Sequence, residues 1–130
     1  MSVRLILDTS ALLAYAAADM RSVELGELIA SVEENGDITG IPALCLIAAY
    51  KQVDVEDRGK LLELAGDDDG PTLILPLLTT EVAQVCELAL QVDDDHGHAV
   101  AERNKHDATL GTYRRQAYAK TLDEYDILDL

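Results

Sequence analysis

The sequence predicts an α/β domain in which helices cover both faces of a central parallel sheet of four or five strands. Three observations lead to this prediction. Short apolar runs typical of buried strands alternate with longer segments of helical periodicity. The chain has 130 residues, the size of one compact domain, and 48% of them are hydrophobic. No internal repeat or linker interrupts the pattern, so residues 1–130 are expected to form a single domain.

The N-terminal segment is expected to form a strand followed by a helix. Val3–Leu7 is apolar except for Arg4, and the polar residues 8–10 follow it directly. This pattern is typical of a buried strand that ends at a turn. Ser10 is placed to cap a helix over residues 11–18, because serine side chains accept hydrogen bonds from the first amides of a helix.

Two further helices are expected on either side of a second strand. The first runs from Ser22 to the Asn35-Gly36 pair, a usual helix end, with apolar residues at helical spacing. Residues 38–41 are the strand, and Pro42 then occupies the first position of the next helix. Residues 43–50 carry no charge, which predicts a helix buried on all sides.

The second half of the chain repeats this alternation. The remaining expected strands are residues 72–75, 108–112 and 127–128. The remaining expected helices begin near Asp54, Thr79 and the acidic turn at residues 93–95, and the last of them runs to Lys105. Residues 67–71 form an acidic loop that is interpreted as solvated. Strands that alternate with helices in this way pair in parallel.

The charge of the chain limits its partners. Its formal net charge is -15, from 25 acidic and 10 basic residues. A field of this sign repels nucleic-acid phosphates, so it works against unaided binding of RNA or DNA. It favours a basic partner or an acid-rich cation site, although an acidic surface also serves solubility alone.

The cysteines and the hydropathy pattern indicate a cytoplasmic protein. Cys45 and Cys86 stand alone, without the paired spacing of a metal site, and are expected to be small buried core residues. No basic leader with a cleavage site and no apolar run of membrane-spanning length is recognised. Cytoplasmic location without membrane attachment is therefore expected.

Three short segments carry a resemblance to a known family. They are LILDTSALLAY at residues 5–15, IPALCL at residues 41–46 and DATLGT at residues 107–112. Their order and spacing resemble the PIN domain family, which includes the VapC toxin ribonucleases. The resemblance implies a three-layer fold with acids at the carboxyl ends of its strands. Several carboxylates gathered there hold Mg²⁺ or Mn²⁺, and the ions activate a water that cleaves a phosphodiester.

Only part of the acidic site that this resemblance implies is present. Asp8 matches the first family acid, although it would equally serve as a turn or helix-capping residue. The second acid is expected at Ala48, and residues 41–53 contain no Asp or Glu. The third position falls on His96, or on Asp95 if the alignment shifts by one residue. An alternative is that residues 93–95 only favour the positive end of a helix.

The fourth acid is replaced by Arg114, with Arg115 beside it. A fixed cation repels a metal ion, and we therefore expect Arg114 to pair with Asp8 in the space of the missing metal. The residues expected to hold a metal are Asp8, Asp94 and Asp95, and those expected to act in catalysis are Asp8, Asp95 and His96. The residues expected to contact a substrate are Thr9, Ser10, Thr112, Arg114 and Arg115.

The histidines and basic residues allow further interpretations. His96 and His98 near Asp95 suggest a mixed nitrogen and oxygen site for Mn²⁺ or Zn²⁺, or else surface or locally hydrogen-bonded side chains. Basic residues gather in the last third of the chain, interleaved with Tyr113 and Tyr118. They are Arg103, Lys105, Arg114, Arg115 and Lys120. This pattern suits the binding of single-stranded nucleic acid, or equally the balancing of neighbouring acids or contact with an acidic partner.

Three functions remain open. The first is a PIN-like protein that has lost nuclease activity and serves as a binding or regulatory partner, with no cofactor. The second is an active ribonuclease of toxin type that uses Mg²⁺ or Mn²⁺ in a rearranged site. The third is an unrelated acidic α/β interaction domain. The resemblance also implies a homodimer and a small basic antitoxin-like partner, whereas the net charge disfavours RNA.

Overall fold

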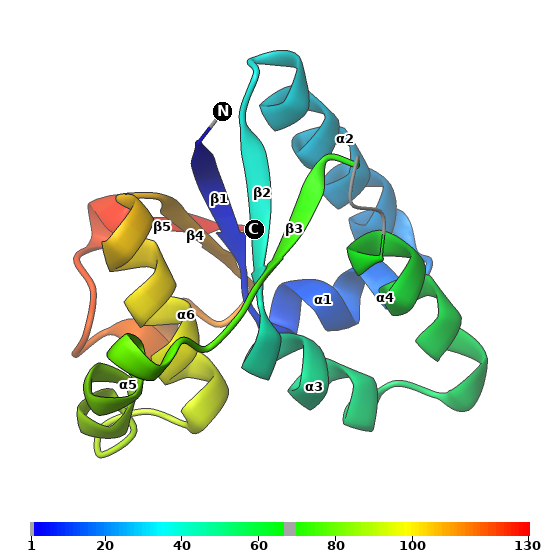
Figure 1. The fold of residues 1–130 in the computed structure, drawn as a ribbon. Coiled ribbons are helices and arrows are strands. Elements are labelled where there is room, and N and C mark those ends of the chain that lie inside the picture. Colours follow the sequence, from blue (N-terminus) through cyan, green and yellow to red (C-terminus); the bar gives the residue numbers. More distant parts are fainter. Residues whose placement is uncertain (1, 67–69) are drawn as a thin grey trace.

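The computed structural model describes residues 2–66 and 70–130, and it contains a five-stranded parallel sheet (Figure 1). The strand order is β3-β2-β1-β4-β5. The strands are β1 (Val3–Leu7), β2 (Ile38–Pro42), β3 (Thr72–Leu75), β4 (Thr109–Thr112) and β5 (Ile127–Asp129). All four neighbouring pairs are parallel, which confirms the predicted sheet.

Helices cover both faces of this sheet and complete a three-layer α/β fold. They are α1 (Thr9–Ala16), α2 (Met20–Glu34), α3 (Ala43–Gln52), α4 (Arg58–Ala65), α5 (Val82–Leu88) and α6 (Asp94–His106). Figure 1 shows α5 and α6 on one side of the sheet, and α2 and α4 on the other. Short 3₁₀ turns at Val55–Asp57, Thr79–Glu81, Arg115–Tyr118 and Glu124–Asp126 complete the chain.

The core is aliphatic and is centred on β1. Leu5, Ile6 and Leu7 are buried, and they pack in one cluster with Leu12 of α1 and Leu110 of β4. The central strand is apolar throughout its last three residues because helices cover both faces of a parallel sheet. Burial of each such side chain contributes about 1.5 to 3 kcal/mol. None of the helices in the described parts of the chain has the length and apolar character that a membrane span requires.

Two helices begin earlier than the sequence predicts, because an aspartate caps each of them. The Asp8 carboxylate accepts a hydrogen bond from the Ala11 amide at 3.0 Å, so Asp8 is the cap of α1 and the prediction for Ser10 is wrong. Asp19 accepts from the Arg21 amide and caps α2, which therefore starts at Met20 and not at Ser22. At the other end of α2, Gly36 has a φ of 81°, as a helix-terminating glycine requires.

The prediction that residues 43–50 are buried on all sides is wrong. Cys45 and Ala49 of α3 are buried, but Ile47 is 51% and Tyr50 36% exposed. Pro42 ends β2 and precedes the helix. One face of α3 packs on the core, and the opposite face lines a shallow apolar groove with Leu62. A charge-free helix is thus compatible with one solvent-facing side.

The cysteines differ from each other in their environment. Cys45 is fully buried as predicted, whereas Cys86 of α5 is exposed, so the prediction of a buried Cys86 is wrong. The reason is that α5 is short and buries only Val85.

The acidic loop predicted at residues 67–71 lies partly outside the described residues, since residues 67–69 are not among them.

Candidate functional site at the carboxyl ends of β1 and β4

A polar pocket lies where the central strands end. Its lining residues are Thr9, Ser10, Leu13, Ala48, Gln52, Asp93, Asp95, His96 and Arg114. They come from α1, α3, the start of α6 and the segment after β4. In open parallel sheets, strand ends of this kind meet in the crevice where ligands bind. The pocket therefore collects most of the candidate residues that the sequence indicates.

Asp8 lies beneath this pocket and is fully occupied by donors from the protein itself. Ser10 Oγ and the Ala11 amide donate to Oδ1 at 2.6 and 3.0 Å. Thr112 Oγ1 and the Tyr118 hydroxyl donate to Oδ2 at 2.6 and 2.7 Å. An ionised carboxylate has about four acceptor sites. Asp8 is 0% exposed, so its carboxylate has no free site and no path to solvent.

The hydroxyls around Asp8 are held in turn by backbone amides. The Tyr113 amide donates to Ser10 Oγ at 3.0 Å, and the Arg114 amide donates to Thr112 Oγ1 at 2.9 Å. Each hydroxyl thus accepts from the chain after β4 and donates to Asp8. This Asp8 network, formed by Asp8, Ser10, Thr112 and Tyr118, joins β1, α1 and β4. Its hydroxyl protons are committed to Asp8, which leaves them unavailable for a substrate.

Tyr118 is a member of the Asp8 network that the sequence reasoning missed. Its ring is 0% exposed, and it is the largest fully buried side chain of the described residues. Burial, followed by the negative charge of the Asp8 carboxylate, raises the pKa of the Tyr118 phenol far above its usual range. The interpretation of Tyr118 as a surface aromatic that stacks on nucleic acid is therefore wrong.

The expected ion pair between Arg114 and Asp8 is absent. Arg114 is exposed and borders the pocket, and among the described residues no cation forms an ion pair with Asp8. The physical reason is that neutral donors already saturate the buried carboxylate. A guanidinium brought to this position would have to lose its hydration without gaining a free oxygen.

Asp95 and His96 both lie in the pocket. Thr9 Oγ1 donates a short hydrogen bond to Asp95 Oδ2, and His96 Nε2 lies 3.8 Å from the same oxygen. The His96 ring packs edge-on against Tyr118, with 5.2 Å between ring centroids. One ligand atom each from Asp93, Asp95 and His96 lie within 4.8 Å of one another, so these residues could share a cation. Both alternatives for the third family position thus face the same space.

Two other candidates lie elsewhere. Asp94 is exposed and lines an apolar groove with residues of α5, so it does not join Asp8 and Asp95. Arg115 lies in another surface pocket, where its guanidinium is 3.5 Å from a carboxylate oxygen of Glu124. The structure therefore separates both residues from the polar pocket, although the sequence places them beside its members.

Much of the predicted basic cluster is neutralised within the chain. Arg103 pairs with Asp107 and Asp126 at 3.1 and 2.8 Å, and Lys105 pairs with Glu81.

Burial raises the pKa of the Cys45 thiol well above its usual range, and the charges of Asp8 and Asp95 add to this effect. The thiol donates to the Asp95 carbonyl oxygen at 3.2 Å, so it serves as a core contact between α3 and α6.

Comparison of the chain with models of protein families and with curated proteins returned no match. The PIN resemblance consequently stands on the three segments LILDTSALLAY, IPALCL and DATLGT. In the structure, the first two span the ends of β1 and β2 and the starts of α1 and α3. The third covers β4, and the polar pocket lies between these elements.

Proposed function

We propose that this chain is a PIN-like domain that has lost metal-dependent nuclease chemistry and acts as a binding or regulatory partner of a basic protein. The saturated Asp8 carboxylate is the observation that carries the proposal. Each of its two oxygens accepts two hydrogen bonds from groups of the chain, and the residue is fully buried. A metal ion at Asp8 would have to displace these donors, and no water shell reaches the residue to compensate them.

The other family positions support the same conclusion. Ala48 and Arg114 line the pocket where the second and fourth acids are expected. Two carboxylates are lost and one cation is gained, a difference of three charges near the expected ion. At such distances each charge pair is worth about 1 to 4 kcal/mol. Even the low end weakens divalent binding by about 100-fold.

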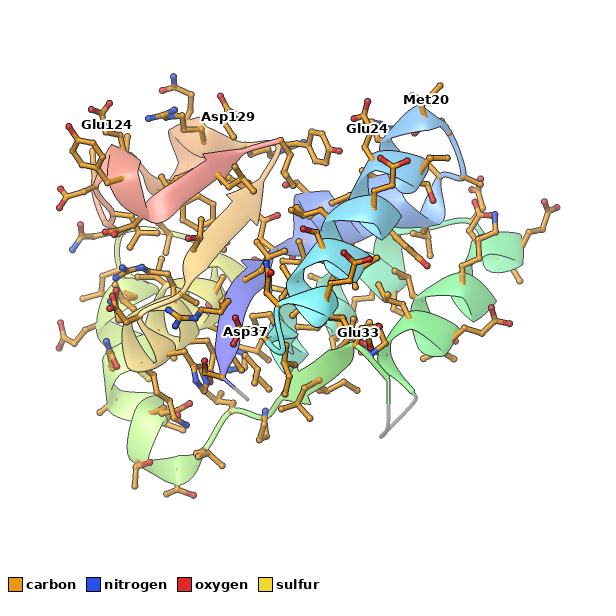
Figure 2. The ribbon with its side chains drawn as sticks, turned by 90° about the horizontal axis from the view of Figure 1, so that it is seen from above. Met20, Glu24, Glu33, Asp37, Glu124 and Asp129 are labelled. Carbon is orange, nitrogen blue, oxygen red and sulfur yellow. The ribbon has the colours of Figure 1, made fainter. Side chains whose placement is uncertain are left out.

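The surface supports a basic partner. The exposed side of α2 carries Glu24, Glu27, Glu33 and Glu34, and Figure 2 shows Glu24 and Glu33 extending from this helix. Glu124 and Asp129 add exposed acids near the C-terminus. Opposite charges steer partners together and fix their orientation. The apolar side of α3, with Ile47 and Tyr50, supplies contact area of the kind that an amphipathic basic segment requires.

An RNA cleavage assay tests the loss of activity. The purified chain is incubated with a panel of RNAs and Mg²⁺ or Mn²⁺, beside an Asp95→Asn variant as the matched control. We expect equal background cleavage in both samples. Cleavage by the wild-type chain that disappears in Asp95→Asn would contradict the proposal. Asp95→Asn is a better control than Asp8→Asn, because Asp95 lies in the pocket while Asp8 supports the fold.

A second candidate function is an active ribonuclease with a rearranged site. The cluster of Asp93, Asp95 and His96 favours it, since these residues bring two carboxylates and an imidazole together in the pocket. This alternative predicts micromolar Mn²⁺ binding that His96→Ala weakens. Calorimetric titration of Mn²⁺ decides between the two functions, because millimolar binding or none is expected of the inactive domain.

The family resemblance itself is tested by restoring the missing acids. The double variant Ala48→Glu and Arg114→Asp changes the pocket by three charges in the direction that attracts a cation. We expect its Mn²⁺ affinity to exceed that of the wild-type chain by about 100-fold. An affinity equal to the wild-type value would mean that the two positions do not converge on an ion site.

The partner proposal is tested with a basic amphipathic helical peptide rich in lysine and leucine. We expect binding that weakens as salt is added, because exposed charges are screened. Charge reversal at Glu24 and Glu27 should weaken peptide binding and reduce its salt dependence. An Ile47→Ser variant should weaken peptide binding without changing the salt dependence. A peptide that binds equally to all three proteins would contradict the proposed surface.

A further inference from the structure

A second polar cluster lies at the interface of α5 and α6, outside the polar pocket. It contains Glu81, His98 and Glu102, which come from the 3₁₀ turn before α5 and from α6. One ligand atom from each residue lies within 4.8 Å of those from the other two. Glu102 is 1% and His98 0% exposed, and Glu81 is also buried. Two carboxylates therefore meet away from solvent.

Each carboxylate of this cluster has one occupied and one open oxygen. Lys105 Nζ donates to Glu81 Oε1, and His98 Nε2 lies 3.2 Å from Glu102 Oε1. Glu81 Oε2 and Glu102 Oε2 are buried and make no hydrogen bond among the described residues, and His106 Nε2 lies 3.3 Å from Glu102 Oε2. Buried acceptors of this kind are almost always satisfied. Because the Glu81 carboxyl lies within hydrogen-bond reach of the Glu102 side chain, either a proton shared by the two carboxyls or a bound cation would satisfy the two open oxygens.

The protonation of His98 follows from its two neighbours. The Leu44 amide donates to His98 Nδ1 at 3.3 Å, so this nitrogen carries no proton. The proton of the neutral ring must then be on Nε2, which donates it to Glu102 Oε1. His98 thus fixes the orientation of Glu102 and leaves Oε2 open. Hydrogen bonds of this type hold the ligating carboxylates of metal sites in place.

His106 supplies a nitrogen ligand on the same face of α6. It follows Glu102 by four residues, and its Nε2 lies 3.3 Å from Glu102 Oε2. Two ligands of one tetrahedral ion, each about 2.0 to 2.1 Å from the metal, lie about 3.4 Å apart. The side chain of His106 is 26% exposed, so the cluster borders solvent at this residue.

We propose that Glu81 and Glu102, through their Oε2 atoms, and His106, through Nε2, bind a Zn²⁺ ion with water as the fourth ligand. Two oxygens and one imidazole nitrogen are a ligand set that zinc accepts in tetrahedral geometry. The two carboxylates offset most of the charge of the ion and of Lys105, which pairs with Glu81. Lys105 and His98 hold the distal oxygens, Glu81 Oε1 and Glu102 Oε1. The ion links the start of α5 to α6.

Zinc binding to the complete chain, measured by calorimetry and by thermal denaturation with and without Zn²⁺, tests this proposal. We expect one bound ion and a higher melting temperature in its presence. Glu102→Gln and His106→Asn should each weaken binding by at least about tenfold. Asp95→Asn is the matched control, since it alters the other cluster of potential ligands and should leave zinc affinity unchanged.

The outcomes separate the two clusters. No zinc uptake by the folded wild-type chain would overturn the proposal. Zinc binding that is lost in Asp95→Asn but kept in Glu102→Gln would place the ion in the polar pocket instead. His106→Asn keeps the test valid if the buried Glu102→Gln substitution impairs folding, because His106 is partly exposed. Circular dichroism of each metal-free variant verifies that the fold is retained.

Discussion

The two buried carboxylate sites of this protein differ in their supply of hydrogen-bond donors. The Asp8 network provides four neutral donors for one carboxylate, and every oxygen site is filled. The cluster around Glu102 brings two carboxylates together and leaves one oxygen of each without a partner. A buried charge is stable only if it is compensated. The first site is thus complete as folded, whereas the second keeps one open oxygen on each carboxylate even though Lys105 pairs with Glu81.

Replacement of the carboxylate by an amide should therefore be much more costly at the first site than at the second. Asp8→Asn replaces one carboxylate oxygen, which accepts two hydrogen bonds, by an NH₂ group that donates. Two buried donors of the Asp8 network then lose their acceptor. We expect the free energy of unfolding to fall by about 2 to 4 kcal/mol. Glu102→Gln instead supplies a donor where acceptors are in excess, and its effect should stay within about 1 kcal/mol. Urea denaturation without added metal measures both.

Equal destabilisation by the two substitutions would contradict the comparison. It would mean that the Glu102 carboxylate is as well satisfied as that of Asp8 and that no ligand is missing between Glu81 and Glu102. A serine or asparagine cap at Asp8 that kept full stability would equally show that the four hydrogen bonds contribute little beyond helix capping.

The fold could be predicted from the sequence because its signals are local. Apolar runs such as Val3–Leu7 define buried parallel strands, and their alternation with helical segments gives the topology class. The errors have local causes too. Asp8 and Ser10 both suit a helix cap, and only the backbone decides between them. A charge-free helix such as α3 does not reveal which of its sides the core covers.

The sites could be predicted only in part, because they depend on contacts between distant segments. The resemblance to the PIN family placed Asp95, His96 and Arg114 around one crevice, and all three line the polar pocket. The sequence did not indicate that Tyr118 is buried against Asp8, because it enters the core from a 3₁₀ turn without helical or strand periodicity. The cluster at Glu102 has one signal that could have found it: His98, Glu102 and His106 recur every four residues on α6.

Removal of the Tyr118 hydroxyl tests the Asp8 network with a smaller perturbation. Tyr118→Phe deletes one of four donors to Asp8 and keeps the buried ring, so we expect a loss of about 1 to 2 kcal/mol at neutral pH. Thermal or urea denaturation measures the loss. A variant as stable as the wild-type chain would mean that Thr112 alone satisfies Asp8 Oδ2.

The pH dependence of this variant sharpens the test. Burial raises the pKa of Tyr118 in the folded protein, so its stabilising contribution is fully present below the unfolded pKa of about 10. Above that pH the unfolded chain loses the proton and the folded chain keeps it. Stability is then lost by about 1.4 kcal/mol per pH unit. The wild-type chain should lose this increment and Tyr118→Phe should not, so their stabilities converge at alkaline pH.

Removal of the Arg114 side chain should have the smallest effect. Arg114 is exposed, and only its backbone amide takes part in the Asp8 network, through Thr112. Arg114→Ala keeps that amide, so the free energy of unfolding should change by less than about 0.5 kcal/mol. The same substitution removes a positive charge from the pocket edge and should tighten Mn²⁺ binding there. A large loss of stability would instead indicate that Arg114 does pair with Asp8. Removal of an exposed arginine that pairs with no buried carboxylate should cost little.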